Sequence, residues 1–133
     1  MQIVVTLDCV DTEVQAGFWL AALAPLDYRR GFDGPPYLSL VSPAPAPTLL
    51  LQQVPEPKHG KNRMHLDLDF DTENLDTEVE RLQRLGAQRI SQEQSEHGFR
   101  WIVLADPEGN EFCVFVPPPE MQGSQRSRPH TQS

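Results

Sequence analysis

The feature that most constrains the fold of this chain is an internal repeat, in which the second half restates the element order of the first. Two stretches of helical periodicity end at Leu23 and Leu85, an offset of 85 − 23 = 62 residues. Two stretches of strand-like alternation end at Val54 and Val116, and 116 − 54 is again 62. A repeat of this length predicts two equal units that pack side by side.

Each half has the pattern of one strand, one helix and three further strands. Alternating β-branched residues indicate the strands, and prolines that remove backbone donors separate them. In the first half we expect strands at 2–9, 26–31, 37–42 and 48–54 and a helix at 12–24. In the second half we expect strands at 63–70, 88–94, 99–105 and 111–116 and a helix at 74–85.

The predicted fold class is therefore α+β, with two tandem βαβββ modules at 1–55 and 62–117. Together the modules are expected to form a curved mixed sheet of eight strands with the helices on its convex face. Residues 118–133 contain almost no apolar side chains and are expected to be a disordered tail.

Both predicted helices have recognisable ends. Asp11 and Thr12 are candidate N-caps of the first helix, Thr12 and Gln15 fit a capping box, and Gly86 is a C-terminal stop for the second helix. Apolar residues at helical spacing predict one buried face on each helix. These residues are Val14, Phe18, Trp19, Ala22 and Leu23 in the first helix and Leu75, Val79, Leu82 and Leu85 in the second.

Period-two alternation assigns the two sides of each strand. Sides that are wholly apolar are expected to pack under the helices, which leaves the mixed sides on the open face of the sheet. The sides predicted to lie under a helix are Leu66, Leu68 and Phe70; Phe112, Val114 and Val116; and Val5, Leu7 and Cys9. The match of Val54 to Val116 places Leu49, Leu51 and Gln53 on the open side.

The open face of a curved sheet is a concave surface, and aliphatic walls with a few polar groups suit a small ligand. The residues predicted to line this pocket are His65, Asp67, Glu111, Cys113, Gln53 and Thr6.

Four further residues have an ordinary structural interpretation. Cys9 and Cys113 are too few for a disulfide scaffold and are expected to act as small buried hydrophobes in a reducing compartment. Tyr37 and Trp101 occupy equivalent repeat positions and are expected to pack in the core.

The composition excludes several classes of partner. The formal charge is −8, and no cluster of lysine or arginine offsets it, so a nucleic acid partner is not expected. No apolar run approaches the roughly 20 residues of a membrane helix. The first residues lack a basic stretch and a cleavage site, so we expect a cytoplasmic protein.

Two segments, KNRMHLDL at 61–68 and DPEGNEFC at 106–113, are the most specific part of a similarity that extends over residues 2–117. These segments resemble the vicinal oxygen chelate superfamily, which includes glyoxalase I, extradiol dioxygenases and bleomycin-resistance proteins. The chain is most similar to actinobacterial glyoxalase-like domain proteins. The resemblance implies paired βαβββ modules, a homodimer, and a divalent metal or a ligand between the strands.

The metal-dependent members of this superfamily take their ligands from the first and last strands of each module. His65 matches one of these positions, but Val4 occupies the equivalent place in the first module. Cys113 stands where a carboxylate is usual, and its counterpart in the first module is expected at Leu51 or Gln53. His65 and Glu111 are the candidate metal ligands, but the set is incomplete, so we expect no cofactor, with a divalent metal as the alternative.

Three functions remain open at this point. The first is a small-molecule-binding protein of the bleomycin-resistance type without a complete metal site, which the loss of ligand positions favours. The second is a metal-dependent lyase, isomerase or dioxygenase. The third is an interaction module whose pocket is vestigial.

Overall fold

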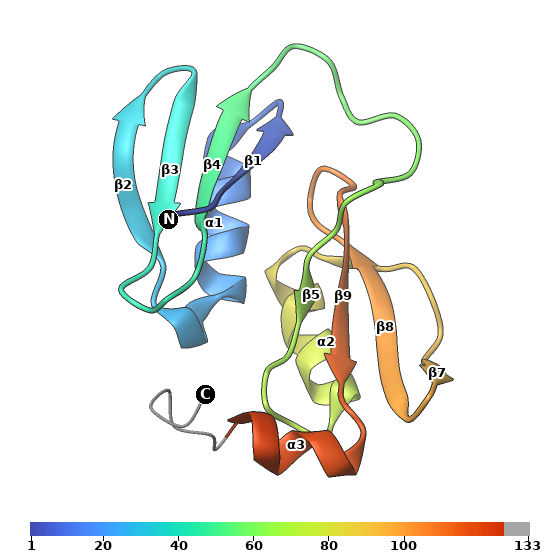
Figure 1. Ribbon diagram of the computed structural model, residues 1–133. Helices are drawn as coiled ribbons and strands as arrows, with labels where there is room; N and C mark the ends of the chain where they lie inside the picture. Colours follow the sequence, from blue (N-terminus) through green and yellow to red (C-terminus); the bar gives the residue numbers. More distant parts are fainter. Residues whose placement is uncertain (127–133) are drawn as a thin grey trace. The chain divides into compact units, whose positions relative to one another are not determined.

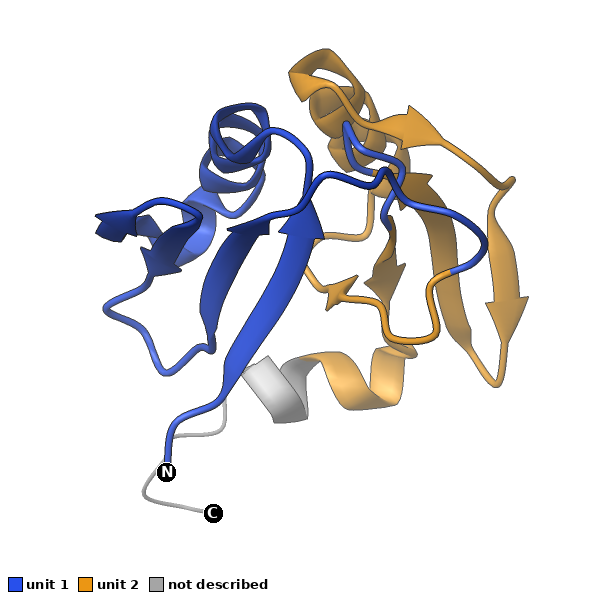
Figure 2. Cartoon of the chain, turned by 90° about the horizontal axis from the view of Figure 1, so that it is seen from above, with its two compact units in different colours: residues 1–61, 106–110 blue, residues 62–105, 111–133 orange. Residues whose placement is uncertain are grey.

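The computed structural model describes residues 1–126 and groups the chain into two compact units. Unit 1 contains residues 1–61 together with 106–110, and unit 2 contains residues 62–105 and the chain from 111 onward (Figure 2). None of the helices within the described residues is long and apolar enough to cross a membrane.

Unit 1 is a four-stranded sheet covered on one face by a helix (Figure 1). Its strands lie in the order β1-β4-β3-β2, with β1 parallel to β4 and the other pairs antiparallel. The elements are β1 (Val4–Cys9), α1 (Thr12–Ala22), a 3-10 turn (Ala24–Leu26), β2 (Arg29–Gly34), β3 (Tyr37–Val41) and β4 (Thr48–Gln53).

Unit 2 repeats this topology with shorter outer strands. Its strands lie in the order β5-β9-β8-β6, and β7 pairs with β8 as well. The elements are β5 (Asp67–Leu68), α2 (Leu75–Leu85), β6 (Gln88–Arg89), β7 (Gln94–Glu96), β8 (Phe99–Ala105) and β9 (Glu111–Val116). The single strand expected at 88–94 is thus two short pieces.

The α+β class and the repeated βαβββ order are confirmed. In the described residues the strands form two separate hydrogen-bonded sheets, one in each unit, where the repeat predicted one sheet of eight strands. The strand expected at 26–31 begins three residues later, because Pro25 and Leu26 belong to a 3-10 turn that Asp27 ends in the left-handed conformation.

The core of each unit lies between its helix and its sheet. Leu75, Val79 and Leu82 of α2 are buried against the inner side of β8 and β9, where Phe112 and Val114 are at most 1% exposed. Burying side chains of this size contributes roughly 1.5–3 kcal/mol each. Two positions predicted for the buried helix faces are wrong, since Leu85 is 36% and Val14 50% exposed.

Of the two N-caps predicted for α1, Asp11 is confirmed, and the capping box of Thr12 and Gln15 is wrong. Asp11 is the N-cap, and its carboxylate accepts hydrogen bonds from the backbone N–H groups of Glu13 and Val14, both at 3.1 Å. Gln15 is fully buried, and its Nε2 donates to Asp106 Oδ2 at 2.8 Å. Gln15 is therefore a core residue of unit 1 and does not belong to the helix cap.

The turn at 106–110 is more than the connection between β8 and β9, because it is part of unit 1. Asp106 is only 3% exposed, and its Oδ2 also accepts from Trp19 Nε1 at 3.2 Å. Its Oδ1 accepts from the backbone N–H groups of Glu108 and Asn110, both at 2.9 Å. A buried carboxylate needs such partners, so Asp106 holds the turn and helix α1 together.

The face assignment predicted for β4 is wrong. Val5 pairs with Leu49 and Leu7 with Leu51 in a parallel ladder, so these residues share the side that faces α1. Leu51 is fully buried. The cause is the register of the repeat: β4 and β9 align at 111 − 48 = 63 residues, not 62. A shift of one residue reverses every side chain in a strand.

The segment expected to be a disordered tail contains helix α3 (Pro119–Arg126). Proline is well suited to the first position of a helix, and Glu120 adds a negative charge to the first turn. Residues 127–133, the rest of the expected tail, lie outside the described residues.

Candidate functional site

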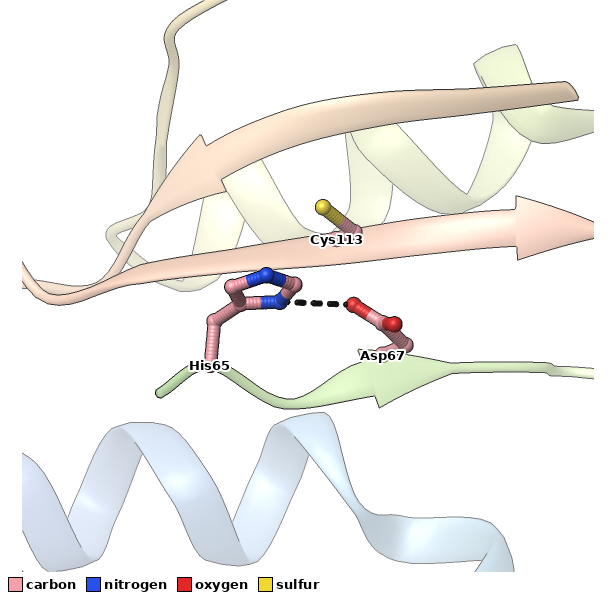
Figure 3. Close-up of side chains that lie close together, drawn as sticks. All are labelled: His65, Asp67 and Cys113. Atoms are coloured by element: carbon pink, nitrogen blue, oxygen red, sulfur yellow. Dashed lines mark hydrogen bonds and ion pairs between the residues drawn. The ribbon is translucent and has the colours of Figure 1, made fainter. Parts of the chain in front are cut away.

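Three of the predicted pocket residues meet on the face of the unit 2 sheet that is opposite α2 (Figure 3). Asp67 of β5 pairs with Cys113 of β9 in a parallel ladder, so their side chains lie side by side. The Cys113 N–H donates to Leu66 O at 2.9 Å, which fixes this register. His65 precedes β5 by two residues, and its ring, Asp67 and Cys113 bring their ligand atoms within 4.8 Å of one another.

The imidazole of His65 is held by its carboxylate neighbour. His65 Nδ1 lies 2.9 Å from Asp67 Oδ1, and the two side chains are 45% and 52% exposed. A carboxylate can only accept, so in the neutral imidazole this bond places the proton on Nδ1 and leaves the lone pair of Nε2 available. The arrangement therefore presents a ring nitrogen with a defined tautomer on an accessible face.

Cys113 is a half-buried thiol in a negative environment. Burial raises its pKa to about 11, and the Asp67 carboxylate, by its charge and a hydrogen bond, and the charge of Glu111 act in the same direction. The group is thus a protonated, unreactive thiol at neutral pH. Cys9 is 1% exposed, and burial, with four nearby carboxylates, raises its pKa to about 12.

Glu111 lies two residues before Cys113 on the same side of β9, as predicted. Its Oε1 accepts a hydrogen bond from the Asn62 backbone N–H at 2.8 Å. Within the described part of the chain, the three-residue cluster does not include it. Glu111 therefore adds negative charge to this face and anchors the start of unit 2.

The two predicted pocket residues of the first module, Thr6 and Gln53, belong to unit 1. Thr6 is exposed on the side of β1 opposite α1, as expected. Gln53 is on the helix side of β4, and its Nε2 donates to Val10 O at 3.4 Å, so its predicted place on the open side is wrong. Gln52, which pairs with Asp8, occupies the open side instead.

An apolar surface beside the cluster was missed by the sequence reasoning. Val103 pairs with Cys113 and Trp101 with Phe115, so these side chains share the face of Cys113. The ring centroids of Phe115 and Phe99 are 6.4 Å apart. Trp101 is half-buried here and Tyr37 is 39% exposed on the equivalent face of unit 1, so the expectation that both pack in the core is wrong. Strand alternation places Trp101 and Val103 on one side of β8, and only the pairing of β8 with β9 shows that this is the side of Cys113.

Replacing Asp67 with asparagine is expected to make Cys113 more reactive. The change removes a charge and a hydrogen bond that raise the pKa of the thiol, but leaves the larger effect of burial. Wild-type Cys113 should react with iodoacetamide at pH 8 about 100 times more slowly than an ordinary thiol, since a pKa two units higher lowers the thiolate fraction by that factor. The variant should react roughly three to ten times faster than wild type.

Mass spectrometry of the alkylated peptides measures the modification of Cys113 and of Cys9 in the same sample. Buried Cys9 should stay unmodified throughout. Asp69→Asn is the matched control, because Asp69 directly follows β5 and is not one of the groups that raise the pKa of Cys113. Equal rates in the Asp67 and Asp69 variants would contradict the described environment of the thiol.

The fold and this cluster define a class of protein built from paired βαβββ modules. The sequence pattern of the glyoxalase-like domain family matches residues 4–115, and the chain belongs to this family. None of the curated proteins matches the sequence.

Solved structures of the glyoxalase/bleomycin resistance/dioxygenase superfamily share the fold. A family enzyme from Burkholderia phytofirmans aligns with a TM-score of 0.70 at 19% identity, over 84% of this chain and 94% of that one. A glyoxalase/bleomycin resistance protein from Albidiferax ferrireducens aligns with a TM-score of 0.66 at 22% identity, over 86% of this chain and 97% of that one. The third structure is a point mutant of the fosfomycin resistance protein FosX from Listeria monocytogenes, complexed with Mn(II) and 1S,2S-dihydroxypropylphosphonic acid. It aligns with a TM-score of 0.71 at 14% identity, over 96% of this chain and 97% of that one.

Proposed function

We propose that this chain binds a small molecule on the open face of the unit 2 sheet, without the complete metal site of the metal-dependent relatives. The observation that carries the proposal is the meeting of His65, Asp67 and Cys113 on one accessible face. The shared fold supports it, because the FosX structure with this fold is complexed with a small molecule, 1S,2S-dihydroxypropylphosphonic acid.

The surroundings of the cluster suit a ligand with an apolar body and a polar end. Trp101, Val103 and Phe115 offer an apolar and aromatic surface, and the cluster beside it offers a ring nitrogen and a carboxylate. Ligand sites combine these features, with a few polar groups that fix orientation. Aromatic rings also stack on flat ligands.

The charge of this face favours a cationic or neutral ligand. Asp67 and Glu111 both lie close enough to Cys113 to influence its pKa, and the chain as a whole carries a formal charge of −8. An anionic phosphonate would be repelled by this potential, whereas a positively charged ligand would be attracted. A cationic glycopeptide such as bleomycin is therefore a better probe than fosfomycin.

The donor atoms do not fit the manganese ion that the FosX structure contains. Mn²⁺ prefers carboxylate, carbonyl and water oxygens, with imidazole as a further ligand. Here the position usual for a carboxylate is Cys113. The 63-residue alignment of β4 with β9 makes Leu50 its counterpart in the first module, so the expected Leu51 or Gln53 is wrong. Neither Leu50 nor Val4 has a side-chain donor. The proposal therefore involves no step on such a metal.

A metal-dependent lyase, isomerase or dioxygenase is the second candidate. It is favoured by one observation, the three potential ligand atoms within 4.8 Å. Elemental analysis of protein purified without chelator distinguishes the metal-dependent enzyme from the non-metal ligand-binding protein. Stoichiometric iron, manganese, nickel or zinc that is lost in a His65→Ala variant would support the enzyme and overturn the non-metal proposal.

A thermal-shift experiment tests the ligand proposal directly. We expect bleomycin to raise the Tm of the wild-type chain in the presence of chelator, and fosfomycin to have no effect. His65→Ala should abolish the shift, whereas His59→Ala, a change at an exposed loop histidine, should retain it. A bleomycin shift that survives His65→Ala, or no shift with any cationic compound of a screening panel, would contradict the proposed site.

We further propose, from the family resemblance, that the chain is a cytoplasmic homodimer. Size-exclusion chromatography with light scattering measures the mass of the assembly. A mass near the 15.0 kDa of one chain would contradict the dimer.

A further inference from the structure

Helix α1 has an apolar outer face that has no counterpart on α2. The two helices occupy equivalent places in the repeat, because they begin at Thr12 and Leu75, and 75 − 12 is 63, the offset that also aligns β4 with β9. On α2 the exposed positions include four polar residues, Thr77, Glu80, Gln83 and Arg84. The matching positions of α1, here called the α1 outer face, are Val14, Gly17, Leu20 and Ala21.

We infer that the α1 outer face is a contact surface between two copies of the chain, related by a twofold axis that passes close to Gly17. A helix that is apolar on all sides is typical of a helix that is buried on all sides, yet Val14 is 50% exposed. The inference rests on the homodimer proposed above, whose surface it names, and it does not depend on the small-molecule proposal.

The charge of the chain favours a second copy as the occupant of this face. A twofold contact places a surface against itself, so a charged surface meets its own charge and is repelled. The chain has a formal charge of −8, but residues 14–26 contain no charged side chain. At one end of this segment Glu13 pairs with Arg30 at 2.9 Å. At the other end Asp27 pairs with Arg29 at 3.1 Å, so the face is uncharged and complementary to itself.

Gly17 supplies an independent observation. Glycine is unfavourable in the interior of a helix, so its presence at the centre of α1 needs a physical reason. A Cβ atom at Gly17 would have no described atom within 4 Å beyond the adjacent residues and the backbone of its own helix. At Gly31 and Gly34, in contrast, the side chains of Ser39 and Phe32 occupy the space that a Cβ atom would need. The missing side chain at Gly17 therefore serves no contact among the described residues, but it allows a second helix to approach closely.

Gly17→Glu tests this surface without disturbing the fold of unit 1. The new side chain enters open space, and glutamate is a better helix former than glycine, so the variant should be at least as stable as wild type. In the dimer, however, it would place two negative charges against each other.

Sedimentation velocity over a range of protein concentrations measures the effect. We expect a wild-type mass near 2 × 15.0 = 30.0 kDa. In Gly17→Glu the dissociation constant of the dimer should rise at least about tenfold, because like charges in a contact are strongly unfavourable. Gln83→Glu is the matched control, because it adds the same charge to the exposed side of α2 and should leave the dimer unchanged. Circular dichroism checks folding, and Val14→Glu is the second variant if Gly17→Glu does not fold.

A cross-link locates the contact directly. Gly17→Cys places a thiol beside the twofold axis, where the Cα atoms of the two copies should come within the roughly 7 Å that a disulfide requires. Mild oxidation should then give a covalent dimer on a non-reducing gel, and Glu80→Cys, at the matching position of α2, should not.

Three results would overturn the inference. They are a wild-type chain that stays near 15.0 kDa at every concentration, a dimer that folded Gly17→Glu and Val14→Glu leave intact, and equal cross-linking of the two cysteine variants. The first result would also contradict the proposed homodimer and would mean that a different partner covers the α1 outer face, whereas the other two would contradict only the surface named here. The thermal shift with bleomycin reports separately on the small-molecule proposal.

Discussion

Replacing Asp106 with alanine is expected to lower the free energy of unfolding by about 3–5 kcal/mol, because it leaves buried donors without partners. The lost acceptor serves Gln15 Nε2 and Trp19 Nε1 on α1, and the backbone N–H groups of Glu108 and Asn110 in the turn. The helix and the turn would both lose the group that joins them. Chemical denaturation followed by tryptophan fluorescence measures the change, and Trp19 itself is a local reporter.

Asp106→Asn refines this test, because it keeps the shape of the side chain. Its amide nitrogen cannot accept, so one set of donors loses its partner, and we expect a loss of roughly 1–3 kcal/mol. Asp33→Asn is the control: Asp33 is 58% exposed and pairs with Arg30 at 3.4 Å on the surface, which is worth at most about 1 kcal/mol. Similar losses in the Asp106 and Asp33 variants would contradict the central place of Asp106 in unit 1.

Leu51→Ala is expected to destabilise the chain by about 2–5 kcal/mol, because it opens a cavity in the core of unit 1. Leu51 is fully buried and, through its pairing with Leu7, faces α1. Its neighbour Leu50 pairs with Thr6 on the opposite, half-buried side. Leu50→Ala is therefore the matched control, and we expect a loss of about 1 kcal/mol or less.

This pair of variants also tests the register of the repeat. An alignment of the halves at 62 residues places Leu51 on the open side, whereas the pairing of β1 with β4 places it under the helix. Urea denaturation of both variants decides between them. A larger loss for Leu50→Ala than for Leu51→Ala would mean that the described register of β4 is incorrect.

The elements that follow from the sequence are those whose signal is local. Phe112, Val114 and Val116 alternate with Glu111, Cys113 and Phe115, and the structure buries the first set and leaves the second half-buried. The stripe of α2 and its end at Gly86 follow in the same way from helical spacing and from a residue that tolerates positive φ. Periodicity therefore located both modules and the side of β9 that carries the cluster.

The features that were missed depend on long-range pairing. The side of β4 follows from its register with β1, and a one-residue error in the repeat reversed it. The role of Gln15 depends on Asp106, which is 106 − 15 = 91 residues away in sequence. A polar residue on the apolar stripe of α1 was the available sign that a buried hydrogen-bond partner existed.

Only part of the candidate site was predicted, because the site also depends on the pairing of strands that are distant in sequence. Alternation placed His65, Asp67 and Cys113 on one side of their strands, and the pairing of β5 with β9 then brought them together. Alternation alone could not exclude Gln53, because its side depended on the register of another strand. Nor did it reveal that Trp101 and Val103 share the face of Cys113, which needs the pairing of β8 with β9.

The most direct test of ligand binding at this face is an NMR screen of a small-molecule fragment library against the isotope-labelled chain. Fragments that bind are expected to shift the backbone amides of Asp67, Val103, Cys113 and Phe115 together, and the His65→Ala variant should lose these shifts. Fragments that bind reproducibly but perturb only other parts of the chain, or a library with no binders at this face, would contradict the account.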